Sequence, residues 1–576
     1  MGNAIQKRGP DSHGEWSDGI NIGLSHRRLS IFDLSSAGHQ PMISPNQRYI
    51  LAFNGEIYNF LELKKFIEEK YSYNSWNGSS DTEVLLTSME FIGVKATLKK
   101  CIGMFAFALW DQKEKKLILG RDRLGEKPLY YGWNNHEKGK TFIFGSDLNA
   151  LKVHPNFNKE LDLNALDLYM SHSYVPSPFS IYKNTSKLNP GCIATISLDE
   201  NEINIKKYWS ASDVFLNGAS NSFKCKEEEI INNLENKLID SIKIQMHADV
   251  PIGAFLSGGI DSSTVVALMQ SQASRPVQTF SIGFEDGDYN EAEYAKKISN
   301  HLNTNHTELY VSGADSLSVI PKLANIYSEP FADSSQIPTY LVSKLARDKV
   351  TVSLSGDGGD ELFGGYNRYI LIQSMWKYIS LIPRPMRLAV SKIFLKIKPN
   401  YWNSFFKLIQ PVIPGSIRQN NWGNKIQKTL QVIALKEIED IYLALVSSGV
   451  EKTNLVKNLD NSSKSIFFED SKILYKLTDI EKMMSLDILN YLPDDILTKV
   501  DRSTMAVSLE ARVPFLDHRV VEFASKIPIN IKIKDGIGKW PLREVLYRHV
   551  PAKLIDRPKM GFSIPLSEWL KDSLKG

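Results

Sequence analysis

Two glycine-rich stretches carry the side chains that could do chemistry on a nucleotide. In the first, AFLSGGIDSS over residues 254–263, two glycines separate a short apolar run from the start of an expected helix. Glycines let backbone N–H groups approach an anion, and the N-terminus of a helix adds positive potential. No Gly-Lys-Ser or Gly-Lys-Thr follows, so γ-phosphate transfer at a Walker A loop is not indicated. Residues of this stretch that could hold phosphate or its Mg²⁺ are Ser257, Gly258, Gly259, Asp261, Ser262 and Ser263.

The second stretch, VSLSGDGGDELFGGY over residues 352–366, also follows a run that is expected to be a strand. Ligands of open parallel sheets bind at the carboxyl ends of the strands, so both stretches should face one crevice. Asp357, Asp360 and Glu361 repel one another, and a divalent cation is the simplest reason for three acids among glycines. A solvated acidic loop is the alternative interpretation.

Strands that alternate with helices surround both stretches. We expect a helix over residues 227–246 and strands over residues 254–256, 277–284, 306–311 and 350–354, with helices between the strands. This alternation predicts a parallel, doubly wound α/β sheet, whose strands would present the two glycine-rich stretches at one edge.

The first 205 residues favour an α+β arrangement instead. The apolar run Tyr49–Phe53 leads into Asn54-Gly55, a turn signal, and helical spacing follows over Phe60–Tyr71. Later apolar runs are expected to pair as hairpins. Pairs of strands with few helices predict sheet-on-sheet layering with flanking helices.

Two further segments differ in composition from the rest. Residues 206–225 are rich in Ser and Asn without strong periodicity and are expected to be a linker. Residues 370–436 contain eleven lysines and arginines and no acidic residue, with Trp and Phe among them. Because prolines interrupt any long amphipathic helix there, we expect a helical insertion with a solvated basic face. Contact with an anionic surface or a partner is the alternative.

Composition excludes several classes of protein. The chain has 576 residues, 42% of them hydrophobic and 23% charged, which is typical of globular proteins with several domains. Its net charge of +4 gives no general reason to expect a nucleic-acid partner. No apolar run reaches the roughly 18 residues of a membrane span, and the first residues do not form a signal peptide. Three cysteines cannot make a disulfide framework, so we expect a cytoplasmic protein.

The two glycine-rich stretches resemble the PP-loop ATP pyrophosphatases, and more narrowly the asparagine synthetase B family. The resemblance covers nearly the whole chain, because other family motifs occur in the same order. They are RGPD at residues 8–11, HRRLSI at 26–31, FNGEIYN at 53–59, SDTE at 80–83, GMFAF at 103–107, LEARVPFLD at 509–517 and RPKMGF at 557–562.

The resemblance implies a glutamine-dependent ligase of two domains. Residues 1–205 would form an αββα sandwich, a class II glutaminase of the N-terminal-nucleophile type. After the linker, residues 226–576 would form a PP-loop ATP pyrophosphatase domain with a basic helical insertion at 370–480. This domain would use ATP and Mg²⁺ to convert aspartate into aspartyl-AMP with release of pyrophosphate. Ammonia from glutamine would pass through an internal tunnel and displace AMP.

The resemblance also implies roles for single residues. In the glutaminase part, Arg28 would bind the α-carboxylate of glutamine and Asp81 its α-ammonium group. Asn54 and Gly55 would form an oxyanion hole, and Glu56 would also belong to the glutamine site. A surface arginine, an ordinary Asn-Gly turn and a helix-capping aspartate are the corresponding structural alternatives.

In the synthetase part, the implied ATP site combines several residues of the two glycine-rich stretches with one more strand. Asp261 and Asp360 would hold Mg²⁺. Asp357 would serve the aspartyl-adenylate or the attack of ammonia, and Lys559 would neutralise charge that develops on the α-phosphate. Lys539 is a second candidate for that role, with a surface lysine as its alternative. The implied ATP- and pyrophosphate-binding residues are Leu256, Ser257, Gly258, Gly259, Asp261, Ser262, Ile282, Ser355 and Gly356.

The sequence departs from the family pattern at its start. The family's nucleophile is a cysteine at the mature N-terminus, whose own α-amino group serves as the base. This chain begins Met1-Gly2, has no cysteine before Cys101, and carries Lys7 where the family has histidine. We expect that the strand bearing the nucleophile is absent, either because the sequence is a fragment, which we favour, or because the glutaminase is lost. The C-terminus also stops short of where bacterial relatives end. The chain as written is expected not to hydrolyse glutamine.

Three other functions stay open on the sequence alone. The acceptor could be a sugar carboxylate of surface polysaccharide synthesis, because the loop near residues 328–335 does not decide between acceptors. A catalytically inactive binding or regulatory relative is a second alternative, and a tRNA-modifying PP-loop enzyme is a third. A homodimer is also an open alternative.

Overall fold

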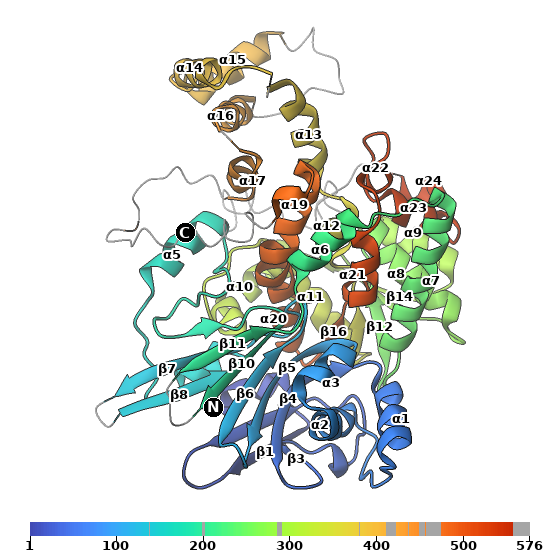
Figure 1. Ribbon diagram of the computed structural model, residues 1–576. Helices are drawn as coiled ribbons and strands as arrows, with labels where there is room; N and C mark the ends of the chain where they lie inside the picture. Colours follow the sequence, from blue (N-terminus) through green and yellow to red (C-terminus); the bar gives the residue numbers. More distant parts are fainter. Residues whose placement is uncertain are drawn as a thin grey trace.

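The computed structural model describes most of the chain in two packed parts (Figure 1). The described residues are all those of the chain except 137–138, 198–201, 285–290, 380, 410–421, 436, 448–455, 457–473 and 557–576. Among them, no helix combines the length and apolar character that crossing a membrane requires.

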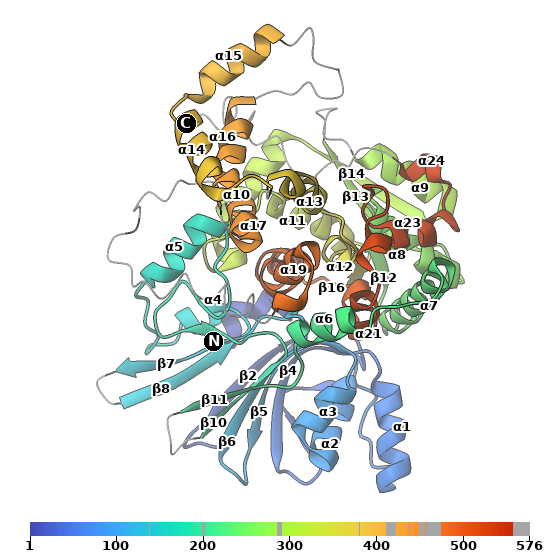
Figure 2. The same ribbon diagram turned by 45° about the horizontal axis from the view of Figure 1, so that its top comes forward.

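The first part is a four-layer αββα sandwich, as the resemblance implied. A six-stranded antiparallel sheet in the order β11-β10-β6-β5-β4-β3 forms one layer. The second β layer consists of two smaller sheets, β1-β2 and β8-β7-β9. Helices α1–α3 cover the outer face of the large sheet, and α4 and α5 lie beyond the second β layer (Figures 1 and 2). The bounds are β1 Ser12–Ser17, β2 Gly23–Arg28, β3 Met42–Ile43, β4 Tyr49–Ile57, α1 Phe60–Tyr71, α2 Asp81–Ile92, α3 Val94–Lys100, β5 Gly103–Asp111, β6 Lys116–Arg121, β7 Tyr130–His136, β8 Gly139–Gly145, α4 Leu148–Lys152, α5 Leu163–His172, β9 Ser186–Lys187, β10 Cys192–Ser197 and β11 Ile203–Lys207.

The turn predicted at Asn54-Gly55 does not exist. Strand β4 runs through both residues to Ile57, and they pair with Ala106 and Phe105 of β5. The glycine is required by close packing rather than by a turn, because a Cβ on Gly55 would lie 2.1 Å from the carbonyl oxygen of Met104. Its φ of +148° is also one that side chains rarely adopt. Pairing with a long neighbouring strand thus overrides the local turn preference.

The second part is a parallel sheet of five strands in the order β14-β13-β12-β15-β16, covered by helices on both faces. The chain builds outward from β12 to β14 and then returns to add β15 and β16 on the other side. The order therefore reverses between β12 and β15, the place where doubly wound sheets bind ligands. The bounds are α7 Glu227–Gln245, β12 Ile252–Phe255, α8 Ile260–Gln272, β13 Gln278–Phe284, α9 Ala292–Leu302, β14 Asn305–Val311, α10 Gly313–Tyr327, α11 Gln336–Arg347, β15 Val352–Leu354, α12 Gly359–Phe363, α19 Asp479–Leu486, a π-helix Asp487–Ile496, α20 Leu497–Met505, β16 Glu510–Arg512, α21 His518–Ser525, α22 Ile529–Lys532, α23 Trp540–Tyr547 and α24 Ala552–Ile555.

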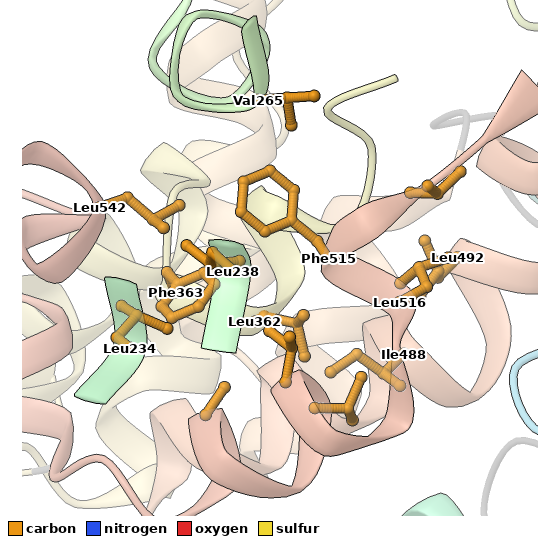
Figure 3. Close-up of a cluster of buried hydrophobic side chains, with 14 of the residues drawn as sticks. Leu234, Leu238, Val265, Leu362, Phe363, Ile488, Leu492, Phe515, Leu516 and Leu542 are labelled. Carbon is orange, nitrogen blue, oxygen red and sulfur yellow. The ribbon is translucent and has the colours of Figure 1, made fainter. Parts of the chain in front are cut away.

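A core of apolar side chains joins elements that lie far apart in the sequence of the second part (Figure 3). Leu234 and Leu238 of α7 face Phe363 of α12, and Leu542 of α23 lies beside them. Buried side chains of the π-helix and of the segment after β16 extend the same core. It thereby fixes α12, which follows the second glycine-rich loop, against the helices around it.

The segment expected to be a linker is partly ordered into helix α6, Ala211–Ser220. Phe215 is buried in the core of the second part, and Gly218 packs so closely on Ser525 that a Cβ would lie 2.3 Å from its hydroxyl. Trp209 donates an indole hydrogen bond to Glu522 at 3.1 Å. The apolar residues of this segment are few but sufficient to dock it on α21.

Helices α13–α16 project from the body of the second part and form an arm (Figures 1 and 2). We use "the arm" for residues 370–436, the basic stretch of the sequence. Helix α16 packs on both α14 and α15. The bounds are α13 Asn367–Ile379, α14 Arg384–Phe394, α15 Pro399–Ile409 and α16 Trp422–Ile433, with α17 Ile438–Val446 leading back to the body.

Buried ion pairs join the two parts. Asp501 on α20 accepts two hydrogen bonds from the Arg8 guanidinium, at 2.7 and 3.0 Å, and lies 3.7 Å from the Lys127 ammonium group. The next residue, Arg502, pairs with Asp147. Burial alone would raise the pKa of Asp501, but the positive charges of Arg8 and Lys127 outweigh it and hold that pKa at about 2. Charges of this kind stabilise a contact only as complete sets.

We predict that Asp501→Asn destabilises the protein by about 3–5 kcal/mol, because it leaves Arg8 and Lys127 without their buried counter-charge. The folded pKa is depressed, so the contribution is present above about pH 4 and is lost as the pH falls through about 2. Thermal and urea unfolding between pH 7 and pH 2 measures both effects. The control is Glu69→Gln, which removes an exposed pair with Lys65 and should cost less than about 1 kcal/mol. Equal losses in the two variants would contradict the prediction.

Candidate active site

A cavity of about 560 Å³ opens where the strand order of the parallel sheet reverses. Both glycine-rich loops line it, the first after β12 and the second after β15, as their sequence pattern predicted. Ile282 on β13 lies on its wall. The other expected residues that line the cavity are Leu256, Ser257, Gly258, Gly259, Asp261, Ser262, Ser355, Gly356, Asp357, Asp360 and Lys539.

The two loops pack directly on each other, and glycines make this approach feasible. A Cβ on Gly356 would lie 2.6 Å from the backbone nitrogen of Ser262, and one on Gly359 would lie 2.4 Å from a carboxylate oxygen of Asp261. Gly258 has a φ of +76°, which favours glycine. Within the first loop the hydroxyls of Ser257 and Ser262 are 3.0 Å apart. The result is a concave rim of backbone amides and hydroxyls at the start of α8.

Lys539 provides the positive charge of the site. Its ammonium group pairs with Asp261 of the first loop and lies 2.8 Å from Asp360 of the second. The side chain is buried, which contradicts the alternative of a surface lysine. Burial disfavours its charged form, but the two carboxylates outweigh that effect and raise its pKa. Lys539 therefore stays protonated and links the two loops.

The acids of the second loop lie in different surroundings. Asp357 accepts a hydrogen bond of 2.5 Å from the Ser355 hydroxyl, and burial raises its pKa although Lys499 lowers it. Glu361 is buried at the cavity wall, where the Tyr366 hydroxyl donates to it at 2.6 Å. Burial and the charge of Asp360 raise the pKa of Glu361 to about 7. The loop is thus not the solvated acidic loop that was the alternative interpretation.

A second charged group borders the cavity, and sequence reasoning did not find it. Lys499 on α20 lines the cavity and donates to Asp333 at 2.8 Å. Burial opposes the charge of Lys499, but Asp333, Asp495 and Asp357 raise its pKa. Burial and the charge of Asp333 raise the pKa of Asp495 well above its ordinary value. Only the loop holding Asp333 had been singled out by sequence, because Lys499 and Asp495 lie inside helical segments without glycine.

The residues expected to bind glutamine lie around β4 in the first part. Asp81 accepts hydrogen bonds from the backbone N–H of Ile57 and of Thr82, both at 2.8 Å, and burial raises its pKa to about 6. Asn54 donates from its side chain to the Ser146 hydroxyl at 3.2 Å. Alternation along β4 places the Gly55 N–H on the same strand edge as the N–H of Ile57.

Arg28 has partners that a glutamine site would not require, and Glu56 lies in buried surroundings. The Arg28 guanidinium donates to the backbone carbonyls of Phe32 and Ser35, at 3.0 and 2.9 Å, and to that of Asp33. Glu56 is buried, and burial together with Asp81 raises its pKa well above its ordinary value. The charge of Glu510 on strand β16 also raises the pKa of Glu56, and that of Arg512 on the same strand lowers it. Glu56 is therefore close to the second part. Lys559 lies outside the described residues.

Comparison with known proteins agrees with this geometry. The family model described as asparagine synthase matches residues 233–576, and that of the glutamine amidotransferase domain matches residues 1–209. Asparagine synthetase [glutamine-hydrolyzing] 1 of Bacillus subtilis is 35% identical, over all of this chain and 84% of that protein. Putative asparagine synthetase [glutamine-hydrolyzing] 2 of Methanocaldococcus jannaschii is 35% identical, over 89% of this chain and 96% of that one.

The chain belongs to the asparagine synthase family.

The three cysteines of this asparagine synthase family member are all described, and two of them are packed away from solvent. Burial raises the pKa of Cys101 to about 12 and also raises that of Cys192. Cys225 is exposed beyond helix α6, on the segment that leads into α7. Cys101 is packed in the core of the first part.

We predict that Gly356→Ala weakens ATP binding at least about tenfold, because the new methyl group would push the second loop off the backbone of the first. Equilibrium binding of ATP and the ATP-dependent rise in melting temperature measure the effect. Gly23→Ala is the control, since a Cβ at Gly23 meets nothing within 4 Å. Unchanged ATP affinity in Gly356→Ala would contradict the packing argument.

Proposed function

We propose that this chain is a glutamine-dependent asparagine synthase that activates aspartate with ATP. The observation that carries the proposal is the pair of glycine loops at the sheet reversal, bridged by the buried Lys539 between Asp261 and Asp360. Aspartate would attack the α-phosphate through its β-carboxylate, giving aspartyl-AMP and pyrophosphate. Ammonia would then displace AMP and leave asparagine.

The first loop would hold the phosphates that leave as pyrophosphate. Backbone N–H groups of Gly258 and Gly259 and the hydroxyls of Ser257 and Ser262 can all donate to phosphate oxygens. Lys539 would donate to oxygens on which charge develops as the bond to the α-phosphate breaks. The base would lie against Leu256 and Ile282, which line the same cavity.

Asp261 and Asp360 fit a magnesium ion, because Mg²⁺ in ATP sites takes one or two carboxylates and completes its shell with phosphate oxygens and water. Both carboxylates contact the ammonium group of Lys539. Their two negative charges exceed its one positive charge, which favours a further cation beside them. When bound, Mg²⁺ would neutralise the pyrophosphate leaving group.

The charged group around Lys499 would bind the acceptor. Lys499 offers an ammonium group for a carboxylate, while Asp333 beside it offers carboxylate oxygens for an ammonium group. Aspartate carries both kinds of charge, whereas a uronic acid has no ammonium group to pair with the acidic side chains. The ionised carboxylate of Asp333 beside Lys499 therefore supports aspartate over a sugar carboxylate.

Asp357 would take a proton when ammonia attacks the acyl-adenylate. The attack forms a C–N bond and a positively charged nitrogen, which must lose a proton before AMP departs. A buried carboxyl with a raised pKa accepts that proton more readily than an ordinary aspartate. Ser355 keeps the carboxylate in place by donating to it at 2.5 Å.

Where glutamine supplies the nitrogen, it would bind beside β4 in the first part, and the cysteine that attacks its amide in the family is not among the residues of the given sequence. Asn54 and the Gly55 N–H would stabilise the oxyanion, and Asp81 would hold the α-ammonium group, which would lower its raised pKa. Arg28 would bind the α-carboxylate of glutamine with those guanidinium N–H groups that do not already donate to backbone carbonyls.

We predict that the chain releases pyrophosphate from MgATP and aspartate and forms asparagine with ammonium as the nitrogen source. Lys539→Met should lower this rate at least about a hundredfold, because a charge that stabilises the transition state is lost. Coupled pyrophosphate release and amino-acid analysis of the product measure both. Lys534→Met is the control, since Lys534 pairs with Glu227 in a partly exposed position. No pyrophosphate release by the unaltered protein with aspartate would contradict the proposal.

We also predict that Asp333→Asn raises the KM for aspartate about tenfold and leaves the KM for ATP unchanged, because it removes one charge-assisted contact at the acceptor end only. The exposed Asp348→Asn serves as the control. Steady-state kinetics with each substrate varied in turn separates the two constants. A larger change for ATP than for aspartate would place Asp333 outside the acceptor site, and faster turnover of a uronic acid than of aspartate would overturn the assignment.

A further inference from the structure

Exposed apolar side chains gather on the arm. Among the described residues, 25 large hydrophobic side chains are exposed, and ten of these lie between residues 371 and 408. Such a concentration on a surface marks a place of interaction rather than chance exposure. The ten are Leu371, Leu381, Ile382, Met386, Val390, Ile393, Phe394, Tyr401, Phe405 and Leu408.

Two helices of the arm present these side chains as regular stripes. Helix α14 exposes Met386, Val390 and Ile393, and helix α15 exposes a second set with the same spacing of four and then three residues. Residues spaced this way share one face of a helix. The second set is Tyr401, Phe405 and Leu408.

The opposite faces of the two helices already pack within the arm. The Phe406 ring stacks on Trp422 of α16 at 4.5 Å, and the Phe394 ring lies 6.0 Å from that of Trp402. Arg387 is buried against Trp376 and donates to the carbonyls of Ile433 and Leu435. The outward stripes are therefore not needed to fold the arm.

The charge of the arm is of one sign. Its residues include eleven lysines and arginines and no acid, whereas the whole chain has 69 basic and 65 acidic residues. The rest of the chain is consequently acidic on balance, and the small net charge hides the contrast. On α14, α15 and the turn between them, five basic side chains are exposed near the stripes: Arg384, Lys392, Lys396, Lys398 and Lys407.

We propose that the arm attaches the protein to an anionic lipid surface, with the stripes of α14 and α15 inserted among the lipid chains and the basic side chains against the headgroups. Helices that lie in a membrane interface combine these two features. A nucleic acid would match the charge but would leave the apolar stripes in water. The helices α14 and α15 project from the body, so that their stripes can meet a flat surface (Figure 2). The proposal takes up the alternative that the sequence left open, contact with an anionic surface.

The test is co-sedimentation of the full chain with vesicles of phosphatidylcholine alone or of phosphatidylcholine with phosphatidylglycerol. We expect binding only to the vesicles with phosphatidylglycerol and weaker binding as salt rises. Lys392→Gln/Lys396→Gln/Lys398→Gln should weaken this binding about a hundredfold, since each basic residue near an anionic surface contributes about 1 kcal/mol. Met386→Gln/Ile393→Gln/Phe405→Gln should abolish vesicle binding at high salt, because salt screens the basic side chains and the apolar contribution has been removed.

Matched controls keep the test specific. Lys95→Gln/Lys99→Gln/Lys113→Gln removes three exposed lysines of the first part and should leave vesicle binding unchanged. All arm variants should retain ammonium-dependent synthesis in solution, which shows that they fold. Equal binding to neutral vesicles, equal loss in the control variant, or absence of binding would each overturn the proposal. A dimer that forms without vesicles and is lost in the apolar variant would assign the stripes to a second copy of the chain instead.

Discussion

The order of five parallel strands is the constraint on which the rest of the structure depends. Because the chain builds outward from β12 and later returns to place β15 beside it, two loops from distant parts of the sequence emerge side by side. Each loop brings a carboxylate, Asp261 and Asp360, and two negative charges so close together repel each other. Lys539, which belongs to neither loop, supplies the shared counter-charge, and glycines at positions 356 and 359 allow the approach. The strand order thus determines which residues the sequence must supply there.

Helix α20 links this site to the amidotransferase part. Lys499, near its start, borders the cavity, while Asp501 and Arg502, within the next turn, make buried ion pairs with Arg8 and Asp147. Lys499, which we propose to bind the acceptor, therefore lies on the same helix that anchors the other domain. Buried pairs of this sort add specificity of orientation more than net stability. A change in the contacts between the first part and α20 would therefore shift the position of Lys499 in the cavity.

Sequence reasoning located the parts of the site that local chemistry dictates and missed those that only distant contacts create. The loops around Gly258 and Gly356 follow strands and precede helices, so their composition alone indicated both structure and role. Lys499 and Asp333 are 166 residues apart and become partners only in the folded chain. Similarly, the Asn54-Gly55 turn was wrong because pairing of β4 with β5 outweighs local propensity, and packing on α21 makes a helix out of an apparent linker.

The arm shows why average properties of a sequence can mislead. A near-neutral net charge gave no general reason to expect a nucleic-acid partner, yet that balance arises from a basic segment attached to an acidic remainder. Prolines argued against a long amphipathic helix, and they do divide the segment, but each short helix between them keeps its own apolar face. Helix α16 packs on α14 and α15, and among the described residues the stripes of these two helices stay exposed. A segment whose exposed side is both apolar and basic is stabilised most by a surface that is apolar within and anionic at its boundary, which is the physical description of a lipid bilayer with acidic headgroups.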